Sequence, residues 1–408
     1  MKSPSSEAKG SLLGAGLVMF LSFAGFSAVQ FHAYLFERMG FSPFRIGVLL
    51  GLGFTAAIVA PVFQVKTMRR LRGPRRALFL TLACAGLTLS GLPHLHGFLP
   101  VAAAFFLVIF FVSGIDPLVT ACTLEVTRAR GRSTYFIIRC LGTLGVLAGC
   151  FVSYFQPRPE FLPRLYLGFG GAFLMALVVA LWGLRPADPR QAPEDVWVSP
   201  HPRHTPTFRR ALWLLSAPRS RRLLWTLGIM NFANAMATLV QGNYLVSRFS
   251  GGQRSISLAW MISTGGEIPL MLLCAWLVRR YGLRVVIGMG LLGTTLKLVI
   301  IGTAETRGMY FTGLLFHGCF FSGALVGFNL YVDQNYRLTD RPALQALGAL
   351  FYQGLPAACG GLMAGILWHF LGLRSVYWVS ATIGAGVAVY TVFLLPQLPA
   401  KLYSQRHP

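Results

Sequence analysis

The chain has 408 residues, of which 55% are hydrophobic and only 12% are charged. Soluble domains carry about a quarter charged residues, so a soluble enzyme, a secreted disulfide scaffold and a nucleic-acid-binding domain are excluded. Apolar runs recur along the whole chain, and each is about 20 residues long, the length that crosses a bilayer as a helix. The formal net charge of +24 therefore reflects membrane topology and attraction to anionic lipids rather than binding of nucleic acid.

Twelve of these apolar runs are predicted to cross the membrane, which makes the fold class an all-α polytopic membrane protein. In chain order they cover 12–36, 44–65, 77–93, 98–122, 134–156 and 163–184, and then 222–246, 255–278, 283–303, 308–333, 343–370 and 373–395.

The twelve spans fall into two halves of equal size. Six spans form a predicted N-terminal bundle over 12–184, and six form a C-terminal bundle over 222–395. Between them, 185–221 alternates prolines with arginines and histidines, which is typical of a solvated linker. Residues 1–11 and 396–408 are predicted as short terminal tails. Two matched halves around a basic linker predict an internally duplicated transporter fold with pseudo-symmetric bundles.

The basic residues indicate the orientation in the membrane. Most Lys and Arg residues lie in the tails, in the linker and in the loops that follow the even-numbered spans. Because positive residues are retained on the cytoplasmic side, both termini are predicted to be cytoplasmic. The compact, arginine-rich chain is in the style of a bacterial inner-membrane protein.

Three ionisable residues lie inside consecutive spans of the second half. Glu267 is near the middle of span eight, Lys297 is in span nine and His317 is in span ten. Ionisable groups at membrane depth are costly and are functional candidates by default. We therefore predict Glu267, Lys297 and His317 as a proton-coupling group. The alternative is a buried Glu–Lys ion pair that only fixes the packing of the helices.

Other polar residues within spans are candidates for binding a solute. Arg139 begins span five and Asp116 precedes a proline in span four, while amides and a histidine occupy spans one and seven, at equivalent places of the two halves. Amides there also join helices by hydrogen bonds, so both interpretations stay open. The residues in spans one and seven are Gln30, His32, Asn231 and Asn234.

No catalytic constellation is present in the sequence. It contains no nucleotide-phosphate loop, no nucleophile–base pair and no cysteine pattern with metal-ligand spacing. We expect no enzymatic activity and no cofactor. The expected partners are a small-molecule substrate and membrane lipids, for a protein that acts as a monomer without nucleic acid.

Several motifs resemble the major facilitator superfamily, in the branch of lactose permease, nucleoside:proton symporters and phenylpropionate permease-like proteins. The loop after span one, the start of span five, the span-eight Glu-x-Pro, the span-ten Leu-x-His and a glycine-rich span eleven are each similar to that branch. The segments are Gly40–Gly47, Tyr135–Gly145, Glu267–Pro269, Leu315–Gly318 and Gln345–Gly365.

The resemblance implies alternating access to a midplane site between two six-helix bundles. It implies substrate binding by Arg139 and Glu267, and proton handling by Lys297 and His317. Where the branch often has a span-four carboxylate, this chain offers Thr120, with Asp116 one turn away.

Two departures from the branch leave other functions open. Phe320 stands where lactose permease carries a proton-binding glutamate, and the loop after span two lacks the glycine and aspartate of the superfamily motif. The sequence therefore predicts a secondary transporter of a small organic solute, with proton-coupled symport as the leading mechanism. The alternatives are an exporter or flippase of lipids or amphiphiles, and a transport-inactive membrane sensor.

Overall fold

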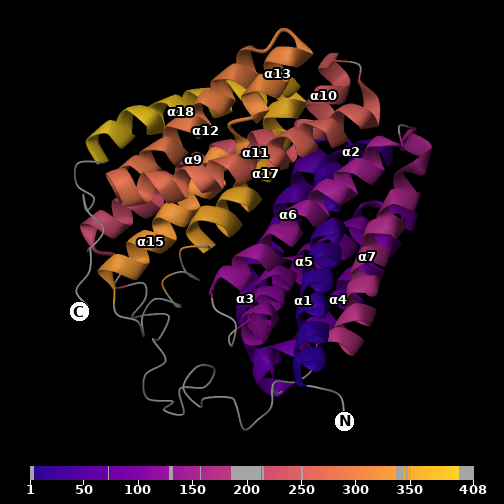
Figure 1. The fold of residues 1–408 in the computed structure, drawn as a ribbon. Helices are drawn as coiled ribbons and strands as arrows, with labels where there is room; N and C mark the ends of the chain where they lie inside the picture. The colour runs from indigo at the N-terminus through magenta and orange to yellow at the C-terminus, as the bar shows by residue number, and fades with distance from the viewer. Residues whose placement is uncertain are drawn as a thin grey trace. The chain divides into compact units, whose positions relative to one another are not determined.

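The computed structural model describes residues 4–71, 73–127, 132–156, 158–184, 213, 216–249, 251–336, 344, 348 and 350–394 (Figure 1). Among these residues the regular secondary structure is helical and contains no strand. Most of the predicted linker 185–221 and the tail 396–408 lie outside the described residues. The chain divides into two compact units, the first containing 1–41, 52–193 and 250–261, the second 42–51, 194–249 and 262–408.

The helices of the first half follow the predicted spans closely. In chain order they are α1 (Pro4–Phe26), the 3-10 helix η1 (Ser27–Phe31), α2 (His32–Arg38), α3 (Pro43–Arg70), α4 (Pro74–Gly91), η2 (Leu92–His94), α5 (Phe98–Thr127), α6 (Arg132–Tyr154), η4 (Pro159–Phe161) and α7 (Leu162–Gly183). Helix α1 begins at Pro4, within the predicted tail 1–11, because proline is favoured at the first helical position.

The second half repeats this pattern with more interruptions. Its elements are α9 (Pro218–Leu239), α10 (Gln241–Phe249), α11 (Gly252–Tyr281), α12 (Leu283–Thr303), α13 (Arg307–Leu314), α14 (His317–Cys319), the π-helix η6 (Phe320–Leu325), α15 (Val326–Asn335), the π-helix η7 (Leu350–Gly354), α17 (Leu355–Leu371) and α18 (Leu373–Leu394).

The described residues contain all or most of each predicted span. Ten segments are long and apolar enough to cross a membrane, and α9 with α10 forms one further span bent by 48°. A shorter apolar helix, Ile138–Tyr154, corresponds to span five. Together they account for the twelve predicted spans.

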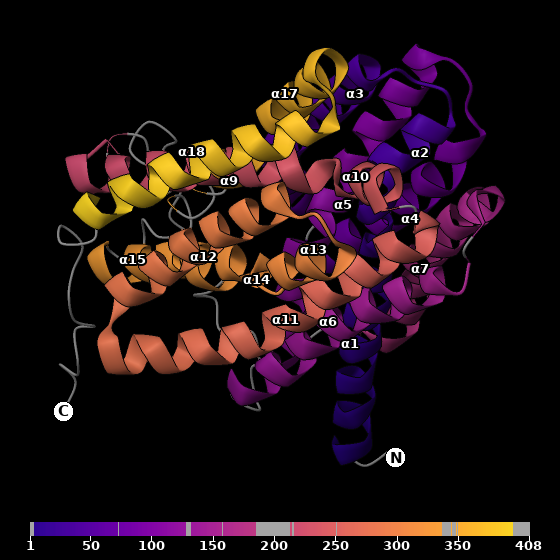
Figure 2. The ribbon, with the colours of Figure 1, turned by 90° about the horizontal axis from the view of Figure 1, so that it is seen from above.

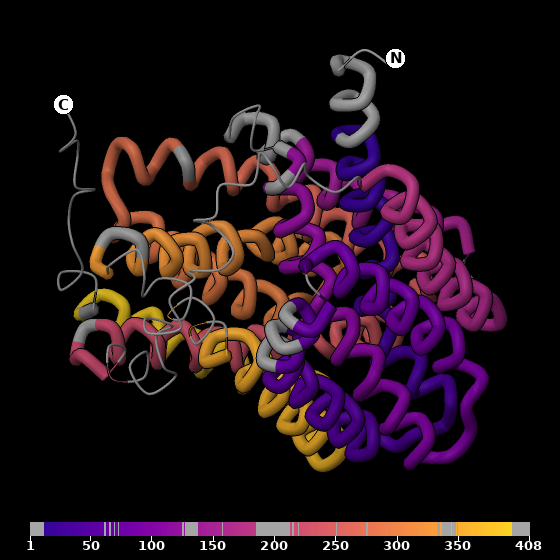
Figure 3. Tube along the Cα trace, turned by 90° about the horizontal axis from the view of Figure 1, so that it is seen from below, coloured from indigo at the N-terminus to yellow at the C-terminus, as the bar shows by residue number. Residues whose placement is uncertain are grey.

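Helix packing within each unit shows the duplication. In the first unit α1 packs against α6 and α7, and α4 packs against α5 and α7. In the second unit α9 packs against α17 and α18, and α12 packs against η6 and α18 (Figure 2). In both, the first span of the half contacts the fifth and sixth, and the third contacts the fourth and sixth. The path of each unit can be followed by colour in Figure 3.

Regular helix geometry is interrupted in spans one, seven, ten and eleven, and span four contains a proline. Span one contains the 3-10 turn η1, and span four carries Pro117 inside α5. Span seven bends where α9 meets α10. Span ten breaks at Leu315 and Phe316, between α13 and α14, and continues as a π-helix. Discontinuous helices line the substrate and ion sites of many transporters, so a site is expected near these interruptions.

Glycine contacts set the distance between α12 and η6. A Cβ atom added at Gly290 would lie 2.3 Å from the backbone nitrogen of Ala324, and one at Gly323 would lie 2.6 Å from the Cα atom of Gly290. Small residues let backbones in a membrane approach closely. The π-helix that follows His317 therefore depends on glycine at both positions.

We predict that Gly290→Ala lowers the free energy of unfolding by about 1–3 kcal/mol, because the added methyl group meets backbone that cannot rotate away. Thermal unfolding of the purified protein in detergent measures this as a lower Tm. Gly171→Ala on α7 is the control, since nothing lies within 4 Å of its added Cβ atom. Equal Tm values for the two variants would contradict the prediction.

Candidate functional site

The side chain of Lys297 is the centre of a polar cluster in the second unit. It lies on α12 with only 1% of its surface exposed. Its Nζ atom is 2.8 Å from Asn234 Oδ1, 3.2 Å from Thr238 Oγ1 and 3.0 Å from His317 Nδ1. An ammonium group has three donors and no acceptor, so these three contacts satisfy a protonated Lys297 completely.

The contact between Lys297 and His317 defines the state of the imidazole. When Lys297 is protonated, it donates to Nδ1 of His317, and that nitrogen must then carry a lone pair. The imidazole proton consequently resides on Nε2, where it can be donated to another group. With Lys297 protonated, the cluster combines a positive charge with a neutral imidazole.

A chain of hydrogen bonds extends this cluster along α9. Asn234 Nδ2 donates to Asn231 Oδ1 over 3.4 Å, and Asn231 Nδ2 donates to the carbonyl oxygen of Tyr352 in η7. Thr238 Oγ1 lies 3.5 Å from Asn234 Oδ1. The cluster thus joins α9, α12, α14 and the π-helix η7, and it links the two π-helical spans of the second unit through α9.

Glu267 lies against the same group of elements. It is half-buried on α11, two residues before Pro269. A Cβ atom added at Gly318 would lie 2.9 Å from both the Cα and the Cγ atom of Glu267, so the residue after His317 packs directly on the glutamate. The Glu267 carboxyl group therefore lies beside the span that carries His317. Pro269 has no N–H, so the Gly265 carbonyl lacks its usual helical donor.

The first unit holds a second polar group. Arg139 on α6 forms an ion pair with Asp116 on α5 at 3.8 Å, and its guanidinium group lies 4.5 Å from the ring centre of Phe23 on α1. Thr120 Oγ1 is 3.5 Å from Asp116 Oδ1. All three polar side chains are partly exposed. The structure therefore brings together Arg139, Asp116 and Thr120, which the sequence predicts separately.

Gln30 and His32 join helices within the first unit. Gln30 Nε2 donates to Cys150 Sγ over 3.4 Å, and His32 Nδ1 lies 2.8 Å from the hydroxyl oxygen of Tyr166. Both side chains are buried. Of the two interpretations left open by the sequence, these contacts favour helix joining over solute binding. The predicted solute-binding role of these two residues stays a prediction.

Three contributors to these groups were missed by the sequence reasoning. Thr238 continues the spacing of Asn231 and Asn234 on one helical face, and this stripe could have revealed it. The Tyr352 carbonyl becomes available within a π-helix, which the sequence does not predict. Phe23 gives no signal, because it is one apolar residue of span one.

Comparisons with known proteins give one consistent family. The MFS_1 like family matches residues 14–379. The fold resembles a point mutant of the nucleoside transporter NupG, with a TM-score of 0.81 at 14% identity over 94% of this chain and 99% of that one. It also resembles a D-xylose-proton symporter, with a TM-score of 0.72 at 16% identity over 96% and 98%.

A third similar fold is that of a bacterial homologue of the human lysosomal transporter Spinster, in an inward-facing conformation, with a TM-score of 0.68 at 13% identity over 98% of both chains. No curated protein matches the chain in sequence. The family match spans most of the chain, and the fold likenesses confirm the twelve-helix architecture. The chain belongs to the major facilitator superfamily, in its MFS_1 like family, and it is an integral membrane transporter rather than an enzyme.

Proposed function

We propose that the protein is a secondary active transporter that moves a small organic solute by alternating access, together with protons. One observation carries the proposal: Lys297 is buried in a membrane-spanning helix and bonded to His317 in the interrupted span ten, and Glu267 lies against the same span. A lysine that only joined helices would not need titratable groups such as His317 and Glu267 beside it. The proton gradient is the proposed energy source.

Each residue of the cluster has a distinct proposed role. Glu267 takes up and releases the proton, because it is the carboxyl group beside the broken span that carries His317. Asn234 and Thr238 hold the ammonium in place in both states. His317 accepts from Lys297 at Nδ1, so its Nε2–H can donate a hydrogen bond to the carboxylate once the proton has left.

Arg139, Asp116 and Thr120 of the first unit are proposed to bind the solute. Arg139 and Asp116 are partly exposed, so their ion pair can exchange for hydrogen bonds to a polar solute. The Phe23 ring beneath the guanidinium group supports a planar or ring-shaped solute by stacking. Nucleosides and sugars, by analogy with NupG and the D-xylose-proton symporter, therefore lead the panel of test solutes, followed by aromatic acids.

The proposed setting follows from the distribution of basic residues. Both termini face the cytoplasm of a bacterial inner membrane in this proposal. The monomeric state is a separate part of the proposal and does not depend on these charges. Protease access to each terminus in sealed inverted and right-side-out vesicles tests this orientation.

We predict that purified protein in liposomes takes up protons when its solute is added, and that Glu267→Gln abolishes this uptake. The amide has the shape of the carboxyl group but cannot exchange a proton at neutral pH. The internal pH is followed with a trapped dye while nucleosides, sugars, aromatic acids and amphiphiles are added in turn.

Glu305→Gln is the matched control, because Glu305 pairs with Arg248 and Arg374 at a surface turn and not with the Lys297 cluster. It should retain the wild-type signal. Solute uptake without any pH change would contradict proton coupling and favour an exporter or amphiphile flippase. Binding of a solute without any movement would favour a sensor.

We predict that Gly318→Ala lowers the rate of proton-linked uptake at least about tenfold. The new methyl group would collide with Glu267 and displace its carboxyl group, and misplacement by about 1 Å costs large factors in function. Gly308→Ala, in the neighbouring α13 with nothing within 4 Å of its added Cβ atom, is the control and keeps the wild-type rate. A Gly318→Ala protein that folds and transports at the wild-type rate would show that transport does not depend on the position of the Glu267 carboxyl group.

A further inference from the structure

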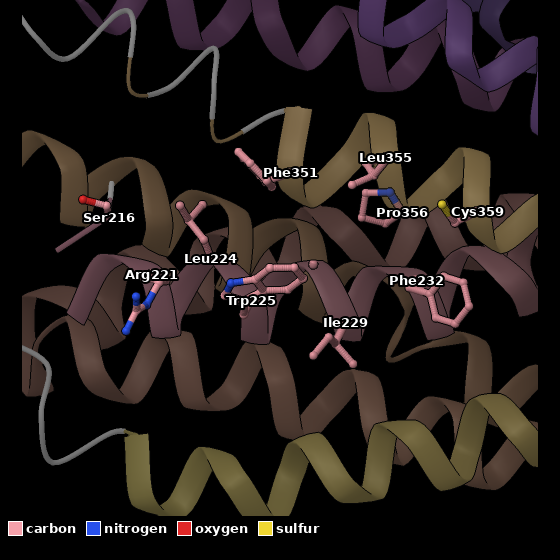
Figure 4. A pocket seen from close by; sticks show the side chains of 11 residues that line it. Ser216, Arg221, Leu224, Trp225, Ile229, Phe232, Phe351, Leu355, Pro356 and Cys359 are labelled. Atoms are coloured by element: carbon pink, nitrogen blue, oxygen red, sulfur yellow. The ribbon is translucent and has the colours of Figure 1, made fainter. Parts of the chain in front are cut away.

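An apolar groove runs along α9 between α17 and α18 in the second unit. Two cavities form it, of about 370 and 460 Å³. Both are lined by Arg221, Trp225 and Ile229 of α9, so this face of the helix is their common floor. Phe351, Leu355 and Cys359 line one wall (Figure 4), and Val387 and Tyr390 of α18 line the other.

The floor of the groove faces away from the Lys297 cluster. Trp225 is 60% exposed and Ile229 is 43% exposed, whereas Asn231 and Asn234 point from the same helix into the unit. The groove is apolar and lies on α9, which together with α10 is long and apolar enough to cross a membrane, so an acyl chain matches its lining chemically.

The length of the groove matches one leaflet of a bilayer. From Arg221 to Phe232 the groove follows eleven residues of α9, or about 16 Å at roughly 1.5 Å per residue. Half of the roughly 30 Å hydrocarbon core is about 15 Å. Figure 4 shows Arg221 near one end and Phe232 and Cys359 at the other.

The end of the groove carries positive charge at the membrane boundary. The bent span begins at Ser220, so Arg221 lies on its first turn, where lipid headgroups are found, and its side chain is exposed. Arg222 lines the second cavity beside it. A guanidinium group binds phosphate oxygens through two parallel hydrogen bonds, and tryptophan is favoured just below the headgroup level.

We propose that this groove binds an anionic phospholipid, with its phosphate on Arg221 and one acyl chain lying over Trp225 and Ile229 toward Phe232. The charge of Arg221 selects an anionic headgroup over a zwitterionic one. The site is separate from the solute and proton sites, so it holds whether or not the protein couples transport to protons.

The test measures lipid binding to the purified full-length protein after removal of bound lipid in detergent. Dioleoyl phosphatidylglycerol and dioleoyl phosphatidylcholine have the same acyl chains and differ in headgroup charge. Native mass spectrometry counts the bound lipids, and thermal unfolding at rising lipid concentration gives the affinity. We expect phosphatidylglycerol to bind at least about fivefold more tightly than phosphatidylcholine.

Variants of the residues that contact the headgroup and the acyl chain distinguish this site from general attraction of anionic lipids to a basic protein. Arg221→Gln should abolish the preference for phosphatidylglycerol, and Arg221→Lys should leave part of it. Arg76→Gln, an exposed arginine at the start of α4, should keep the preference. Trp225→Ala should lower the affinity for both lipids. Trp182 on α7 is likewise exposed, and Trp182→Ala should lower neither affinity.

Equal affinity for the two lipids in the wild-type protein would overturn the proposal. So would a folded Arg221→Gln protein that keeps its preference for phosphatidylglycerol, or a loss of preference in Arg76→Gln that equals the loss in Arg221→Gln. If Arg221→Gln does not fold, the proposal is overturned when Arg221→Lys keeps the full preference for phosphatidylglycerol and Trp225→Ala binds both lipids with wild-type affinity.

Discussion

The buried charge of Lys297 constrains the second half of this transporter more than any other single feature. A lysine at membrane depth costs roughly 2.5–3.5 kcal/mol on insertion scales unless its donors are satisfied. Asn234, Thr238 and His317 provide the three acceptors, and they come from α9 and α14. A charged Lys297 can remain buried only while α9 and α14 keep their acceptors around α12. The buried charge therefore constrains the position of His317 and the packing of α9.

Interrupted helices make this arrangement possible. A continuous helix through residues 308–333 would place successive side chains by a fixed rotation of about 100° per residue, whereas the break at Leu315 and Phe316 frees His317 from that register. The π-helix after it changes the register again. Gly318 and Gly323 allow the broken span to press against Glu267 and Gly290. Ionisable residues and small residues thus occur side by side here, and the small residues permit the close approach.

The twelve spans could be predicted from sequence because an apolar run of about 20 residues in a charged-residue-poor chain has one physical solution. The membership of Glu267, Lys297 and His317 in one group was predictable for a similar reason, since each is ionisable and lies inside a span. The bonding pattern was not. The sequence suggested a Glu–Lys ion pair as the structural alternative, and the structure gives Lys297 neutral acceptors from Asn234, Thr238 and His317.

The reason is that the direction of a side chain depends on breaks that leave no clear sequence signal. Neither η1 nor the bend at Val240 contains a proline, and the amides of spans one and seven look alike in sequence. In the structure Gln30 joins α6, whereas Asn234 holds Lys297. The limits of the two bundles, the coupling roles and the orientation in the membrane remain predictions.

A role of Lys297 in coupling, rather than in solute binding, can be tested by comparing two kinds of transport in liposomes. Counterflow exchanges labelled for unlabelled solute and needs no net proton movement, whereas accumulation driven by an imposed pH gradient does. We predict that Lys297→Gln retains counterflow within about threefold and loses gradient-driven accumulation. The amide can still bond Asn234, but the substitution removes the positive charge of the cluster. Equal loss of both activities, or wild-type accumulation in the variant, would contradict the account.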